Sequence, residues 1–209
     1  MVVPDFEKID QTPIPPEDKY DVFYSTFGTT RKQAGGAQGF RKIEFYQVHA
    51  AKWARNHLGI PEAHLVTSSG SDPNSFLLYP QVKGQIEKEY IDLKFPRLAI
   101  YRPAMLVGRT HDERFLEKIG VALTTSAPVD WLFRKVSPEH ASIQVDVVAK
   151  AMVQQTINWN AKPENSTEPI VKIFGGSQAI EQLCGINRGR SPTTTTTNSD
   201  SSTKNENRD

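Results

Sequence analysis

The chain has 209 residues, with 25 Lys and Arg against 24 Asp and Glu and a formal net charge of +1. This balance argues against a nucleic-acid-binding surface built from bulk charge. Its apolar stretches are far shorter than the ~20 residues that cross a bilayer, so we expect a soluble protein without a membrane span. The single cysteine, Cys184, excludes an internal disulfide and a cysteine-rich metal site, and it suits a reducing compartment.

Strand and helix patterns alternate through the first half of the chain. Aromatic and β-branched runs that end in turn residues predict strands, and apolar residues at three- and four-residue steps predict helices. The predicted strands are Tyr20–Phe27, His64–Thr67 and Arg97–Val107, and the predicted helices are Phe40–Leu58 and Phe76–Leu93. This alternation is typical of an α/β fold with a parallel sheet.

The patterns are weaker in the second half. Glu113–Val121 is a candidate helix, Ala141–Trp159 has a helical pattern, and Ile170–Phe174 is a late strand. Residues 188–209 contain no apolar side chain that could be buried, so this polar segment predicts a disordered tail. The chain is therefore expected to form one α/β domain over residues 1–187, followed by the tail.

The most informative combination is Ser68, at the end of a predicted strand, with Tyr79 and Lys83 on the next helix. Residues four apart lie on one face of a helix, which brings the phenol and the ammonium together. A phenol has a reference pKa of about 10, and an adjacent ammonium favours the phenolate. Such a pair can transfer a proton, while a serine hydroxyl can donate a hydrogen bond to a carbonyl oxygen that gains charge.

These residues also have purely structural interpretations. Tyr79 alone would be an amphipathic residue at a helix start and Lys83 a solvated lysine, but their combination with the strand-end serine favours a site. Arg31 is equally consistent with a contact to a cofactor phosphate and with an ordinary loop cation. His49 and His57 have no third ligand nearby, so we expect no metal site.

The combination resembles the short-chain dehydrogenase/reductase superfamily over about residues 2–153. Tyr79 and Lys83 match its YxxxK motif, Ser68 matches its strand-end serine, and Arg102-Pro103 closes the following strand. More narrowly, several short motifs resemble the Tat-interacting oxidoreductase family, an atypical NADPH-binding branch of that superfamily. These motifs are Phe27-Gly28-Thr29-Thr30-Arg31, Ala34-Gly35, Gly39-Phe40, Leu78-Tyr79, Gln81-Val82-Lys83-Gly84 and Leu93-Lys94-Phe95.

The resemblance implies roles for individual residues. Tyr79 would be the proton donor and acceptor, Lys83 would hold the nicotinamide ribose, and Ser68 would polarise the substrate carbonyl. Thr67 and Ser69 are weaker candidates for the role of the serine. The residues implied in NADPH contact are Phe27 and Gly28 at the strand end, Tyr79, Lys83, Asp5 near the adenine, and Arg114.

The glycine-rich part of a dinucleotide site does not occur in this sequence. A dinucleotide-binding fold needs a glycine-rich turn beside its first strand, but the chain has no G-x-G-x-x-G or G-x-x-G-x-x-G motif. We therefore expect a partial Rossmann-like, doubly wound parallel sheet that lacks its first two βα units. Impaired NADPH binding and an uncovered sheet edge at Tyr20–Phe27 would follow.

Two functional hypotheses follow from these features. The first is an NADPH-dependent oxidoreductase that acts on a small carbonyl compound of unknown identity. The alternative is a non-enzymatic interaction protein, for which the resemblance implies protein partners in transcription control, nuclear transport or apoptosis, without direct nucleic-acid binding. We expect a cytoplasmic protein that can also lie in the nucleus or at the nuclear envelope, with the mitochondrial outer surface as a minor alternative.

Overall fold

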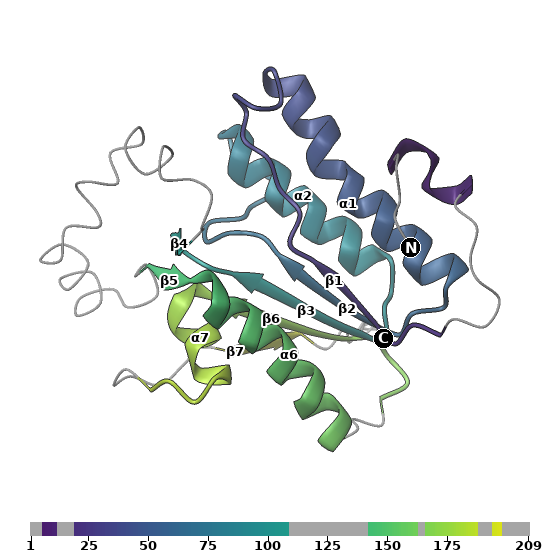
Figure 1. Cartoon of the computed structure of the whole chain (residues 1–209), viewed down its shortest axis with the longest axis vertical. Helices are drawn as coiled ribbons and strands as arrows, with labels where there is room; N and C mark the ends of the chain where they lie inside the picture. The colour runs from purple at the N-terminus through teal and green to yellow at the C-terminus, as the bar shows by residue number, and fades with distance from the viewer. Residues whose placement is uncertain (1–5, 12–18, 109–141, 163–165, 188–193, 198–209) are drawn as a thin grey trace, which may run out of the picture.

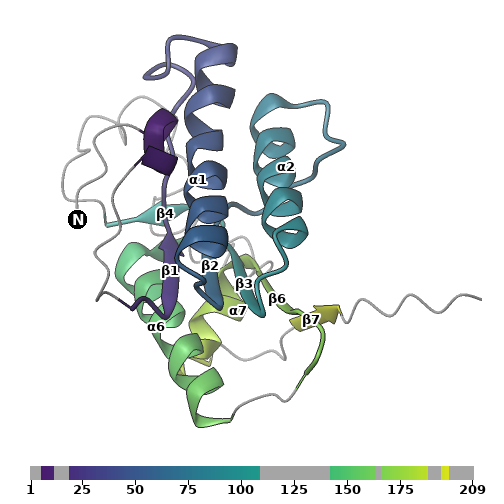
Figure 2. The ribbon, with the colours of Figure 1, turned by 90° about the vertical axis from the view of Figure 1, so that its right-hand side faces the viewer.

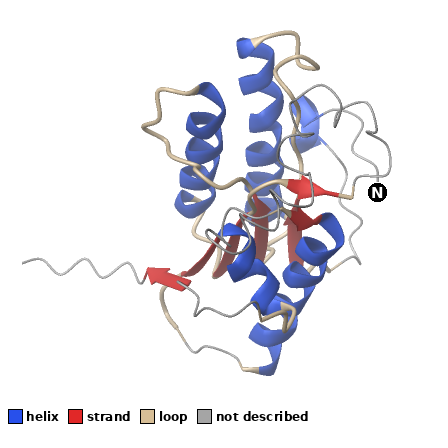
Figure 3. Cartoon of the chain, turned by 90° about the vertical axis from the view of Figure 1, so that its left-hand side faces the viewer, coloured by secondary structure: helices blue, strands red, loops and turns tan. Residues whose placement is uncertain are grey.

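A computed structural model describes residues 6–11, 19–108, 142–162, 166–187 and 194–197 of the chain. At its centre lies a sheet in the order β1-β2-β3-β6-β7, whose first four strands are parallel. The strands form a middle layer with helices on both sides (Figure 3). The parallel strands are β1 (Val22–Ser25), β2 (Glu62–Val66), β3 (Arg97–Arg102) and β6 (Ile170–Gly175). The predicted α/β fold with a parallel sheet is confirmed.

The helices cover the two faces of the sheet in pairs. Helices α1 (Ala37–His57) and α2 (Leu78–Asp92) lie on one face, and α6 (Val145–Ala161) and α7 (Gly176–Leu183) lie on the other (Figure 1). Figure 2 shows the same layers from the side, with the short helical segment η1 (Phe6–Gln11) next to α1. Because helices cover both faces, β2 is buried along its whole length, as strands of parallel sheets usually are.

Each face of the sheet has its own apolar core. Alternate residues of a strand point to opposite faces, so Leu98 and Ile100 of β3 join one core while Ala99 and Tyr101 join the other. The α1–α2 side also buries Phe40, Leu65, Val82, Ile86, Tyr90 and Phe95. The α6–α7 side also buries Met152, Trp159, Phe174 and Ile180. The central strands are thus held by packing on both sides.

The predicted strand Arg97–Val107 is two strands in the structure. β3 ends at Arg102, and the residues beyond it include β4 (Leu106–Val107), which pairs with β5 (Ile143–Gln144) in a separate small sheet. Pro103 explains the break, because proline has no backbone N–H with which to continue the hydrogen-bond ladder. This break turns the chain away from the large sheet directly after Arg102.

Four residues of the segment predicted as a disordered tail, 188–209, lie in a strand. Thr194–Thr197 form β7, which pairs antiparallel with β6 from Val171 to Phe174. Threonine is β-branched and favours extended backbone, so a short run of it can pair with a strand edge without contributing apolar side chains. The rest of the tail and the candidate helix Glu113–Val121 lie outside the described residues.

A buried polar network joins β2, β3 and α6. The side chains of Glu62 and His64 are fully buried, and His64 Nε2 lies 2.8 Å from Glu62 Oε1. His64 Nδ1 lies 3.0 Å from the hydroxyl of Tyr101, and the Thr156 hydroxyl donates to Glu62 Oε1 at 2.5 Å. Arg97 completes the network with a nitrogen 2.9 Å from Glu62 Oε2. These bonds fix the two strands and the helix relative to one another.

The network has one stable arrangement of protons at neutral pH. Burial lowers the pKa of His64, although the neighbouring Glu62 carboxylate acts in the opposite direction. Burial raises the pKa of Glu62, but hydrogen bonds from His64 and Thr156 and the charge of Arg97 outweigh it and hold that pKa below its usual range. A neutral His64 imidazole that donates a hydrogen bond to a charged Glu62 carboxylate agrees with the lowered pKa of both groups.

Acid should therefore destabilise the fold through His64. Its pKa is lower in the folded chain than in the unfolded chain, so the unfolded chain takes up the proton first as the pH falls below about 6.5. We expect the free energy of unfolding, measured by urea denaturation at a series of pH values, to decrease below that pH. His64→Gln should flatten this decrease, whereas His49→Gln on the exposed side of α1 should keep it. Equal pH dependence in both variants would contradict the assignment.

The loop after β2 is pressed against α2 at Gly84. A Cβ at this position would lie 2.3 Å from the backbone N of Pro73 and 2.4 Å from the carbonyl carbon of Asp72. The backbone N–H of Asp72 also donates to the carbonyl of Pro80 at 3.1 Å. This close approach holds the loop that contains Ser68 next to the helix that carries the predicted tyrosine and lysine.

Gly84→Ala should lower the free energy of unfolding by about 1–3 kcal/mol, because the new methyl group meets backbone atoms that have no room to move. The measurement is urea denaturation followed by circular dichroism. Gly175→Ala is the matched control, since a Cβ there would meet nothing within 4 Å. A Gly84→Ala variant as stable as the control would show that the loop does not depend on this contact.

Candidate functional site

A pocket of about 890 Å³ lies at the carboxyl ends of the parallel strands. The turn after β1, the segments after β2 and β3, and the first turns of α2 and α6 line it. In open parallel sheets, ligands commonly bind beyond the carboxyl ends of the strands. Five of the predicted site residues line this one pocket: Phe27, Gly28, Ser68, Tyr79 and Lys83. Asp5 and Arg114 lie outside the described residues.

Ser68 presents a buried hydroxyl without a partner in the described part of the chain. Its Oγ is inaccessible to solvent and makes no hydrogen bond, while its backbone carbonyl accepts a bond from the Ser71 hydroxyl at 2.7 Å. An unsatisfied buried polar group costs about 1–3 kcal/mol. A ligand oxygen that reached Oγ from the pocket would remove this cost.

The neighbouring hydroxyls are less available. The hydroxyl of Thr67 donates to Glu87 Oε1 at 2.5 Å, and Glu87 in turn accepts a bond of 2.9 Å from Arg102 Nε. Ser69 is not among the residues that line the pocket. Of the three candidates from the sequence, Ser68 is therefore the one that the structure favours.

Tyr79 and Lys83 share a face of α2, as their spacing predicted, but their environments differ. Tyr79 lies in the first turn and is 48% exposed, with its ring centroid 6.0 Å from that of Phe40. Lys83 lies one turn deeper and is buried, with Nζ 5.8 Å from the centroid of the Tyr79 ring. The phenol thus stands at the mouth of the pocket and the ammonium forms part of its inner wall.

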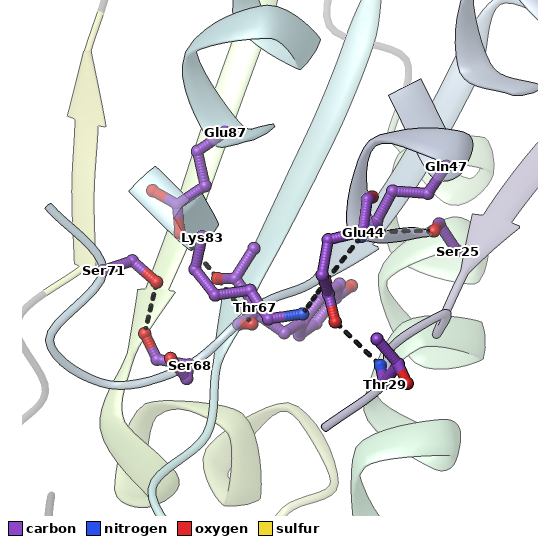
Figure 4. Close-up of polar contacts among 10 residues, drawn as sticks. Ser25, Thr29, Glu44, Gln47, Thr67, Ser68, Ser71, Lys83 and Glu87 are labelled. Atoms are coloured by element: carbon purple, nitrogen blue, oxygen red, sulfur yellow. Dashed lines mark hydrogen bonds and ion pairs between the residues drawn. The ribbon is translucent and has the colours of Figure 1, made fainter. Parts of the chain in front are cut away.

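Glu44 is a site residue that the sequence interpretation missed. It lies on the buried face of α1, lines the pocket, and places Oε2 2.6 Å from Lys83 Nζ (Figure 4). The periodicity of the α1 segment predicted a packing helix and gave no role to its acidic residue. The available signal was an acidic side chain on the same helix face as the apolar residues Phe40 and Val48, since an unpaired buried charge is unfavourable.

Other candidates take no part in the pocket. Arg31 is exposed and is absent from the pocket lining. Burial raises the pKa of the Cys184 thiol, whose Sγ donates to the carbonyl of Val147 at 3.5 Å, in agreement with an unreactive thiol.

In the described ranges, no group of three His, Cys, Asp or Glu side chains could hold a metal ion. Within the same ranges, every helix is too short or too polar to cross a bilayer.

The pocket can therefore bind and polarise a small oxygen-bearing group. It offers a buried hydroxyl donor at Ser68, a phenol at Tyr79 and an ammonium at Lys83. Apolar side chains, among them Leu106, Val148 and Met152, complete the lining. A pocket that is apolar apart from a few convergent polar groups is typical of small-molecule sites.

Comparison with known proteins places the chain among fungal and animal relatives. It is 33% identical over 167 residues to the mitochondrial protein FMP52-1 of Scheffersomyces stipitis, covering 78% of this chain and 69% of that one. It is 32% identical to the mitochondrial protein FMP52 of Candida albicans, covering 80% and 70%. It is also 33% identical to protein HTATIP2 of Rattus norvegicus, covering 75% and 61%.

Comparisons with family models and solved structures add little. No family model matches the chain. A crystal structure of UDP-galactose 4-epimerase aligns with a TM-score of 0.41 and 15% identity, covering 68% of this chain and 52% of that chain.

The match to HTATIP2 in the comparison with curated proteins supports the resemblance to the Tat-interacting family.

The names of the fungal relatives correct one expectation and establish the family. A cytoplasmic or nuclear location was expected, but the FMP52 relatives are named as mitochondrial proteins, so that expectation is wrong. The chain spans about two thirds of the length of these relatives. With 33% identity across 69% of the Scheffersomyces stipitis protein, the chain belongs to the FMP52 family.

Proposed function

We propose that this chain is an oxidoreductase that reduces the carbonyl group of a small molecule with NADPH as the hydride donor. The observation that carries the proposal is the unpartnered hydroxyl of Ser68 in the same pocket as Tyr79 and Lys83. The preference for NADPH over NADH rests on the resemblance to the Tat-interacting family. When bound, the dinucleotide supplies the hydride, and the protein supplies orientation and proton transfer.

The pocket wall at Gly28 fits a group that approaches Lys83. A Cβ at this glycine would lie 3.6 Å from Lys83 Nζ and 3.5 Å from Glu44 Oε1, so a side chain here would fill the space beside both atoms. The nicotinamide end of the cofactor would lie against Phe27 and Gly28, and Lys83 would donate a hydrogen bond to its ribose. The volume of the pocket lies within the ~300–1,000 Å³ typical of small-molecule sites.

The protein groups divide the work of the reaction. Ser68 would donate a hydrogen bond to the carbonyl oxygen, which becomes negative as the hydride arrives. Tyr79 would give its phenolic proton to that oxygen and form an alcohol. Lys83, on the same helix face, would stabilise the phenolate that Tyr79 leaves behind.

Tyr79→Phe should lower NADPH-dependent turnover of small aldehydes and ketones by at least ~10²-fold, because it removes the transferable proton. The NADPH binding that the chain retains without a glycine-rich motif, measured by titration calorimetry, should change little, since the ring remains in place. The control is Tyr24→Phe, which alters another half-exposed tyrosine that does not line the pocket. Undiminished turnover in Tyr79→Phe would overturn the assignment.

Protein binding is a second candidate function, supported by the edge of the sheet. Among the strands that the structure describes, β1 pairs with β2 alone, and Tyr24 on β1 is 43% exposed. An extended segment of a partner protein could add to this edge as a further strand. Such binding would survive Tyr79→Phe, whereas carbonyl reduction would not.

The family also suggests where the protein acts. Since the FMP52 relatives are named as mitochondrial proteins, we propose a mitochondrial location for this chain. Immunodetection in fractionated cells of the source organism should find it with purified mitochondria. Detection in the cytosolic or nuclear fraction, without mitochondrial enrichment, would rule this location out.

A further inference from the structure

The Glu44 carboxylate connects three elements around the pocket. Its Oε1 accepts the backbone N–H of Thr29, in the turn after β1, at 2.7 Å. Its Oε2 accepts Lys83 Nζ of α2 at 2.6 Å and Gln47 Nε2 of α1 at 3.3 Å. Figure 4 shows the Lys83 side chain directed at this carboxylate, with Thr29 on its other oxygen. The turn, α1 and α2 therefore meet at one charged group.

This ion pair is unusual because it is both buried and part of a pocket wall. The side chains of Lys83 and Glu44 are 6% and 0% exposed. A buried ion pair contributes little net stability compared with apolar residues of the same size, since both charges lose their hydration. Its presence on the wall of the pocket therefore indicates a role toward a ligand, in addition to the link that it makes between α1 and α2.

The pair restricts where the lysine ammonium can lie. A lysine side chain is long and flexible, and its ammonium has three donor hydrogens. One donor is used by Glu44, and the described residues provide no hydrogen-bond acceptor for the other two. Glu44 thus holds Nζ beside the Tyr79 ring and leaves two donors for a molecule in the pocket.

Two carboxylates of the described residues line the pocket, and Glu44 is the one that contacts Lys83. Asp146 of α6 also lines the pocket, but it is paired with Lys150 at 3.4 Å. Glu44 is therefore the pocket carboxylate that holds Lys83.

We propose that Glu44 is a positioning residue, which holds the Lys83 ammonium beside the Tyr79 ring for the proton transfer. This inference rests on the proposed reaction at Tyr79. The role belongs to Glu44 alone among the buried carboxylates of the described residues, because Glu62, Glu87 and Glu181 do not line the pocket.

The variant that tests the proposal is Glu44→Gln, which keeps an oxygen for Thr29 and removes the charge. In the chain without dinucleotide, acylation of Lys83 by isotope-labelled acetic anhydride, measured by mass spectrometry, should become about threefold faster or more, because Nζ loses the charged acceptor that holds it. Exposed Lys52 provides the internal reference. In turnover assays, kcat should fall by about tenfold with little change in KM, because the ammonium is no longer held beside Tyr79.

The matched control is Glu62→Gln, which removes an equally buried and ion-paired carboxylate outside the pocket. It should leave both the labelling of Lys83 and kcat unchanged. If Glu44→Gln also left both unchanged, the positioning role would be refuted. Equal effects of the two variants would show a general loss of stability and would likewise refute it.

Gly28→Ala tests the same pair if Glu44→Gln does not fold. Its methyl group would lie in ordinary contact with Glu44 Oε1 and Lys83 Nζ, at 3.5 and 3.6 Å, and would cover them without breaking the ion pair. Labelling of Lys83 should then slow by about threefold or more, since access from the pocket is lost. Unchanged labelling would contradict the view that the pair faces the pocket.

The two experiments separate this inference from the proposed function. The labelling readout needs no cofactor or substrate, so it tests the Glu44–Lys83 pair even if the wild-type chain shows no turnover. Absence of turnover in the wild-type chain, with the expected labelling, would reject the oxidoreductase proposal but keep the pairing. Turnover that depends on Tyr79 but not on Glu44 would reject the positioning role alone.

Discussion

Buried carboxylates must be paired, and this requirement joins the elements of the fold. Three of the four buried glutamates in the described residues each meet a cation from another element, so that these helices and strands are fixed together. The pairs are Glu44 with Lys83, Glu62 with Arg97, and Glu87 with Arg102. They link α1 to α2, β2 to β3, and α2 to β3. Apolar packing holds the helices against the sheet, and these ion pairs fix how the paired helices and strands are placed relative to one another.

The three ion pairs have different surroundings, which distinguish the pairs that support the fold from the pair that lines the pocket. The pair at Glu62 lies in a network with His64 and Thr156, where every partner is another part of the fold. The pair at Glu87 supports Thr67, directly before the pocket serine. Only the pair at Glu44, among these three, has both of its charged groups on the pocket wall. The same type of contact, a buried glutamate paired with a cation, therefore lines the pocket at Glu44 and supports the fold at the two other positions.

Much of the fold follows from local sequence patterns, and so do the residues that the pocket brings together. The four-residue spacing of Tyr79 and Lys83 placed them on one helix face, and the end of β2 placed Ser68 opposite that helix. The role of Glu44 could not be found in this way, because its partner is 39 residues away and is met only after two helices pack. Strand β7 escaped prediction for a similar reason, since its residues are polar and its partner strand lies earlier in the chain.

The pairing of β7 has a consequence for assembly. The two edge strands of the described sheet differ, because β7 pairs with the outer side of β6. One edge is β7, a short antiparallel strand, and the other is β1, a partly exposed parallel strand. If two copies of the chain paired through their β1 strands, each β1 edge would be hydrogen-bonded to the other and neither could accept a further strand. Association of that kind stops at two molecules, whereas a sheet that could extend equally at both ends would propagate into a fibre.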